Sequence, residues 1–105
     1  MAATGTVTPD GDIVIHNKGT FTYTVAFRDQ LGAARDVSAR NLYFVTNSGI
    51  RVMLLPGETN AQKRLVIPQE TLKVALRVTS EFAIVDETDP LHVVEWSGRL
   101  HVKGW

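Results

Sequence analysis

The residues of this sequence that could perform chemistry include three histidines and a few serines. A serine nucleophile needs a base and an orienting acid, usually in a setting such as G-x-S-x-G. That motif does not occur, and we interpret Ser48 and Ser97 as a turn residue and a strand residue. His16, His92 and His101 have neither the H-x-H nor the H-E-x-x-H spacing of a zinc site. We therefore predict no catalytic residue and no metal ligand, and expect the protein not to be an enzyme.

A group of acidic residues could supply paired carboxylates or calcium ligands. Asp86, Glu87 and Asp89 lie within four positions of one another. We interpret them as a solvated hairpin loop, and a hydrolase pocket formed by Asp86, Asp89 and His92 is the alternative. The Asp-Gly-Asp stretch at residues 10–12 lacks the further oxygen ligands of a calcium loop. Neither G-x-G-x-x-G nor G-x-x-x-x-G-K occurs, so we predict no cofactor.

Length, charge and cysteine content exclude several classes of protein. The chain has 105 residues, the size of one domain. Its 11 basic and 11 acidic residues balance, so we expect no nucleic-acid partner. Without cysteine there is neither a disulfide framework nor a thiolate metal site. We see no signal peptide and no apolar stretch long enough for a membrane span, and therefore expect synthesis in the cytoplasm and no membrane contact.

The elements that must position these residues are expected to be strands. Thirteen valines, eleven threonines and five isoleucines favour β-structure. In residues 20–28, Phe21, Tyr23, Val25 and Phe27 alternate with polar residues, and we predict that this face lies in the core. Turn residues separate the other apolar runs. The expected strands are residues 12–16, 20–28, 41–46, 50–55, 63–67, 81–86 and 91–96, with a final extended run over residues 93–105.

One segment fits two structures. Leu72, Val74, Leu76 and Val78 have strand spacing, but Leu72, Ala75 and Leu76 also form a helical stripe. Pro68 followed by Gln69 and Glu70 is typical of a first helical turn. We predict one or two helical turns from Gln69 to Ala75.

The last run, EWSGRLHVKGW, divides its residues between two faces. Strand alternation puts Val94, Trp96, Leu100 and Val102 on a core face. The opposite face holds the residues that we predict to contact a partner, which are Arg99, His101, Lys103 and Trp105. A bulge at Gly98 or Gly104 would turn Trp105 into the core, where it would close the sandwich.

Several stretches carry a resemblance to a known family. Immunoglobulin-like domains in tailed-phage virion proteins open with a stretch similar to FTYTVAFRDQLGAARDVSARNLYFVTNSG. Their closing part is similar to RLVIPQETLKVAL, FAIVDET and WSGRLHVKGW. The N-terminal domain of upper baseplate proteins is the named family that the sequence resembles. The resemblance spans residues 19–105. It implies an all-β fold, a single immunoglobulin-like β-sandwich of about seven strands, preceded by an arm with a short strand at residues 1–18.

The resemblance also implies a place in a phage particle. It indicates a structural protein that contacts other phage structural proteins, present as a homo-oligomer or in several copies within the virion, in the tail, baseplate, neck or head surface. Because the sequence stops at Trp105, we expect an adaptor or decoration subunit. The alternative is a carbohydrate-binding β-sandwich for attachment to the host surface, in which Trp96 or Trp105 stacks on a sugar ring.

Overall fold

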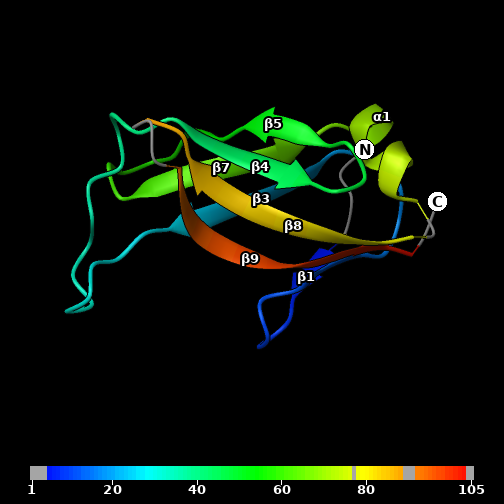
Figure 1. Cartoon of the computed structure of the whole chain (residues 1–105), viewed down its shortest axis with the longest axis horizontal. Helices are drawn as coiled ribbons and strands as arrows, with labels where there is room; N and C mark the ends of the chain where they lie inside the picture. The colour runs from blue at the N-terminus through cyan, green and yellow to red at the C-terminus, as the bar shows by residue number, and fades with distance from the viewer. Residues whose placement is uncertain (1–4, 77, 89–91, 104–105) are drawn as a thin grey trace.

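Two β-sheets packed face to face form the protein (Figure 1). The computed structural model describes residues 5–76, 78–88 and 92–103. The larger sheet has the strand order β1-β2-β9-β8-β4-β5, and the smaller has the order β3-β7-β6. This arrangement confirms the predicted all-β sandwich. The strands are β1 (Gly5–Val7), β2 (Ile13–Ile15), β3 (Phe21–Ala26), β4 (Leu42–Thr46), β5 (Arg51–Met53), β6 (Leu55–Pro56), β7 (Gln62–Ile67), β8 (Thr79–Asp86) and β9 (Val93–Val102).

The core lies between the two sheets and consists of side chains from alternate strand positions. Phe44, Ile84 and Leu100 come from three neighbouring strands of the larger sheet, and Leu65 and Ile67 face them from the smaller one. Their side chains are completely buried. Because successive strand residues point to opposite faces, this alternation is what the sequence pattern predicts.

Residues near the start of the described part of the chain belong to the larger sheet. Strand β2 pairs with β1 on one side and runs parallel to β9 on the other, with Ile13 opposite Leu100. Ile13 and Ile15 are completely buried. Residues 5–15, which the sequence analysis placed in an N-terminal arm, therefore contribute to the sheet and to the core.

The predicted helical turns are present. Helix α1 (Gln69–Leu72) begins directly after Pro68 and continues into a 3-10 turn, η1 (Lys73–Ala75). Leu72 and Ala75 are buried, whereas Val74 is exposed, so the helical stripe prevails over the strand pattern in this segment. Within the described part of the chain, no helix is long and apolar enough to cross a membrane.

The prediction that Val94 lies on the core face is wrong. Ile84 of β8 pairs with Trp96, but the next residue, Val85, pairs with Val94, so Glu95 is an extra residue in β9. Such a β-bulge shifts the alternation, so that residues on its two sides, such as Val94 and Trp96, no longer share a face of the sheet. Val94 is consequently on the outer face, with 58% of its surface exposed.

The prediction for the core face of β3 also needs correction. Phe21 and Phe27 are buried and Val25 is half-buried, but Tyr23 is 37% exposed. Because β3 is the terminal strand of the smaller sheet, no further described strand covers the side chain of Tyr23 on that side. Tyr23 instead lies at the rim of a groove.

Candidate functional site

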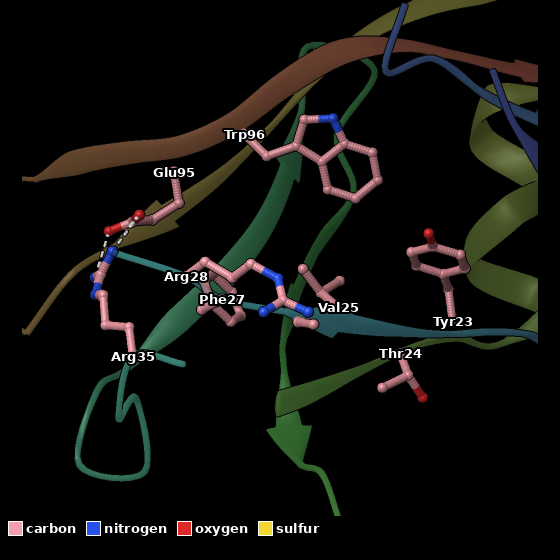
Figure 2. Close-up of a pocket in the computed structure, with 9 residues that line it drawn as sticks. Tyr23, Thr24, Val25, Phe27, Arg28, Arg35, Glu95 and Trp96 are labelled. Atoms are coloured by element: carbon pink, nitrogen blue, oxygen red, sulfur yellow. Dashed lines mark hydrogen bonds and ion pairs between the residues drawn. The ribbon is translucent and has the colours of Figure 1, made fainter. Parts of the chain in front are cut away.

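A groove runs along β3 and is the candidate functional site. It has a volume of about 440 Å³. Six consecutive residues, 23–28, form one wall, and Arg35, Glu95 and Trp96 form the other. Figure 2 shows Glu95 and Trp96 projecting from β9 toward β3. The bulge is the reason that two neighbouring strand residues face the same groove.

One end of the groove is closed by an ion pair between residues 60 positions apart. The guanidinium of Arg35 donates two hydrogen bonds to the carboxylate of Glu95, with N–O distances of 2.7 and 2.9 Å (Figure 2). The side chain of Glu95 is only 13% exposed. Hydrogen bonding to Glu95 raises the pKa of Arg35 above its ordinary value, so the contact favours the charged form that arginine already has. The pair ties the segment after β3 to the bulge in β9.

Trp96 anchors the aromatic side of the groove. Its indole Nε1 donates a hydrogen bond to the carbonyl oxygen of Gly11 at 3.0 Å. The ring packs edge-on against Phe82, at 5.0 Å between centroids, and lies 6.2 Å from the ring of Tyr23. Trp96 therefore connects buried Phe82 with exposed Tyr23, and the prediction that it packs against the core is confirmed for its inner edge only.

A compact turn beside the groove presents an apolar side chain to solvent. The carboxylate of Asp29 accepts hydrogen bonds from the backbone N–H groups of Leu31 and Ala33. The N–H of Gly32, which has a φ of +84°, donates to the carbonyl of Asp29. Leu31 is 94% exposed in this turn.

The groove carries an uncompensated positive charge. Arg28 donates a hydrogen bond to the carbonyl oxygen of Gly32 at 3.2 Å. Arg35 is paired with Glu95, but no described carboxylate lies within ion-pair distance of Arg28. The groove therefore combines an aromatic surface at Tyr23 and Trp96 with a cation suited to a carboxylate.

The residues predicted to contact a partner lie elsewhere. Arg99 and His101 share the outer face of β9, as alternation predicts, and Lys103 is exposed directly after the strand; none of the three lines the groove. The Arg99 backbone N–H donates to the Asp12 carboxylate. His101 Nδ1 is 3.3 Å from the hydroxyl of Thr79. Trp105 falls outside the described residues, so the partner role of these four residues stays a prediction.

The acidic residues near position 87 hold the end of β8 in place. Asp86 is buried and accepts a hydrogen bond from the N–H of Thr88. Burial would raise the pKa of Asp86, but hydrogen bonds from Thr88 and the charges of Arg40 and Arg35 outweigh it, so the pKa lies below its ordinary value. Arg51 donates two hydrogen bonds to Glu87 and lowers its pKa in the same way.

The sequence left open a calcium site or a hydrolase pocket formed by the acidic residues near position 87. Among residues 5–76, 78–88 and 92–103 there is no group of three or more His, Cys, Asp or Glu side chains that could hold a metal ion. Asp89, which completed the calcium and hydrolase alternatives, lies outside these ranges. The hydroxyl of Ser48 bonds to those of Thr46 and Ser80, as suits a turn residue.

Stability should fall in acid, and Asp86 should be one cause. A carboxyl group whose folded-state pKa is lowered stabilises the fold fully above its unfolded pKa of about 3.9, and the contribution is lost as the pH falls through the folded value. At pH 7, Asp86→Asn should therefore lower the free energy of unfolding by about 1–3 kcal/mol. Urea unfolding at pH 7 and at pH 2 should show a smaller difference from wild type in acid. If Asp86→Asn differed from wild type by the same free energy of unfolding at pH 7 and at pH 2, this explanation would be contradicted. The control is Asp10→Asn, at an exposed turn, which should change stability little at either pH.

The groove has no signature in the sequence alone. Strand alternation predicts Trp96 in the core and Glu95 on a polar face, and Arg35 lies in a connection for which the sequence predicts no role. The exposed turn had a visible signal, the Asp29…Gly32 spacing, and Leu31 is an apolar residue within it. The pairing of Arg35 with Glu95 leaves no local signal, because it depends on a contact between distant segments.

Among solved structures, the fold is similar to that of a phage protein domain. The chain is similar to the N-terminal domain of phage TP901-1 ORF48, with a TM-score of 0.51 and 11% sequence identity. The match covers 97% of this chain and 96% of that domain. No family model matches the sequence, and no curated protein matches it. At this identity, the similarity shows a common fold.

Proposed function

We propose that this chain is a non-enzymatic structural subunit of a tailed-phage particle, acting through contacts with neighbouring particle proteins. The observation that carries the proposal is the shared fold with a phage protein domain over nearly the whole length of both chains. The resemblance found in the sequence points in the same direction. We infer an adaptor or decoration role at the tail, baseplate, neck or head surface, with several copies in each virion.

The test is to look for the chain in purified particles. Particles made by the genome that encodes the chain would be separated from free protein on a density gradient and analysed by quantitative mass spectrometry. We expect the chain to sediment with the particles in a constant ratio to the major structural proteins. Its absence from particles, while it is present in the same lysate as free protein, would overturn the proposal.

A second candidate function, carbohydrate binding, is favoured by the aromatic side of the groove. Tyr23 and Trp96 lie beside Arg28, Arg35 and Glu95, and sugar sites combine aromatic faces with polar groups of this kind. If this candidate holds, the isolated domain should bind on a glycan array, and Tyr23→Ala should abolish that binding without changing the melting temperature. No binding by the wild-type domain would exclude it.

A further inference from the structure

The free edge of β3 differs from the other free sheet edges of the described chain. Strands β1 and β5 end the larger sheet and have three residues each, and β6 has two residues, one of which is Pro56. Strand β3 has six residues, FTYTVA, with neither proline nor charge. Proteins usually protect sheet edges by shortness, proline or charge, because an unprotected edge pairs with other chains. Strand β3 has none of these protections.

The hydrogen-bond pattern shows which backbone groups of β3 are unpaired. Residues of β3 and β7 pair antiparallel, and the N–H of Phe27 donates to the carbonyl of Ala61 at the end of that ladder. In an antiparallel pair, only every second residue points its N–H and C=O toward the partner strand. Val25 and Tyr23 therefore point these groups toward β7, whereas Thr22, Thr24 and Ala26 point theirs away from it.

The groove lies along the same edge and offers contacts to the side chains of an added strand. Tyr23 and Trp96 provide an aromatic surface, and Arg28 provides a positive charge (Figure 2). Strand addition obtains affinity from the backbone hydrogen bonds and specificity from such side-chain contacts.

We propose that the β3 edge binds an extended segment of another particle protein, which adds a fourth strand to the smaller sheet. The segment carries an apolar or aromatic side chain that packs on Tyr23 and Trp96, and an aspartate or glutamate that pairs with Arg28. This inference rests on the proposed function and names the surface through which the chain contacts its neighbour.

A proline at position 24 tests the role of the backbone. Thr24→Pro removes an N–H that points away from β7 and leaves the β3–β7 ladder intact. The control is Met53→Pro, in β5. Because Thr46 N–H bonds to the carbonyl of Ile50, the same alternation turns the N–H of Met53 outward. Both variants should keep the melting temperature of the wild type within a few degrees.

Incorporation of the variants into particles gives the result. We expect wild type and Met53→Pro to be incorporated equally, and Thr24→Pro to be reduced about tenfold or more. Equal incorporation of Thr24→Pro would overturn strand addition while leaving the proposed function intact. Absence of the wild type from particles would overturn both. A dimer of the isolated wild-type chain that Thr24→Pro dissociates would assign the edge to a second copy, and would also overturn the proposal.

A second measurement applies if Thr24→Pro fails to fold. Wild-type protein is mixed with an array of overlapping 12-residue peptides that cover the particle proteins, and amide hydrogen exchange is followed with each binding peptide. We expect slower exchange at Thr22, Thr24 and Ala26, and loss of binding when the acidic residue of the peptide is replaced by lysine. The proposal would be overturned if no peptide in the array bound. It would also be overturned if peptides bound but none of them slowed exchange at these three amides.

Discussion

Replacing Phe82 with alanine is expected to lower the free energy of unfolding by about 3–5 kcal/mol. Phe82 is 3% exposed and lies between two other aromatic rings. Its centroid is 5.1 Å from that of Phe44 and 5.0 Å from that of Trp96, which it meets edge-on. Alanine would leave a cavity and also remove two aromatic contacts, each worth about 0.5–1.5 kcal/mol beyond its buried area.

Chemical denaturation followed by circular dichroism would measure this loss. Val94→Ala, on the exposed face of neighbouring β9, is the control and should change stability by no more than about 0.5 kcal/mol. Because a domain of this size is stable by only about 5–15 kcal/mol, Phe82→Leu provides a milder variant that should still fold. A loss below 1 kcal/mol for Phe82→Ala would show that Phe82 does not support the core as described.

Much of the fold could be predicted from local patterns. The alternation of β-branched and polar residues located β4, β5, β7 and β8 within a few residues of their observed ends, because each strand buries one face against the other sheet. Pro68 marked the start of α1, since proline suits a first helical turn and cannot continue a strand ladder. The Asn-Ser-Gly turn between β4 and β5 was equally visible, with Gly49 at a φ of +106°.

The groove depends on contacts that leave no local pattern. The bulge at Glu95 places that carboxylate where Arg35, 60 residues earlier, can bind it. Strict alternation put Val94 and Trp96 on one face, and the single extra residue separated them. The parallel pairing of β2 with β9 is equally non-local, because it joins the second strand of the described chain to the last one. Such pairings are decided by packing between segments far apart in sequence.

Replacing Gly98 with valine is expected to destabilise the protein by about 1–3 kcal/mol and to loosen Trp96. A Cβ atom at Gly98 would lie 2.6 Å from the carbonyl oxygen of Gly11 and 3.1 Å from the ring of Phe82. The Gly11 carbonyl is the acceptor for the Trp96 indole. Because backbone atoms cannot yield as a flexible side chain can, the turn at residues 8–12 must move away, and the hydrogen bond to Trp96 should break.

Fluorescence can follow this displacement at Trp96 directly. The chain has two tryptophans, so a Trp105→Phe background leaves Trp96 as the only tryptophan, whose emission can be excited selectively. In that background, Gly98→Val should shift the emission to longer wavelength, because the indole becomes more exposed to water. Ser97→Val is the matched control: it adds the same branched side chain at the adjacent, exposed position and should leave the emission unchanged. An unchanged spectrum for Gly98→Val would mean that the close approach of Gly98 to Gly11 does not position Trp96 in the groove.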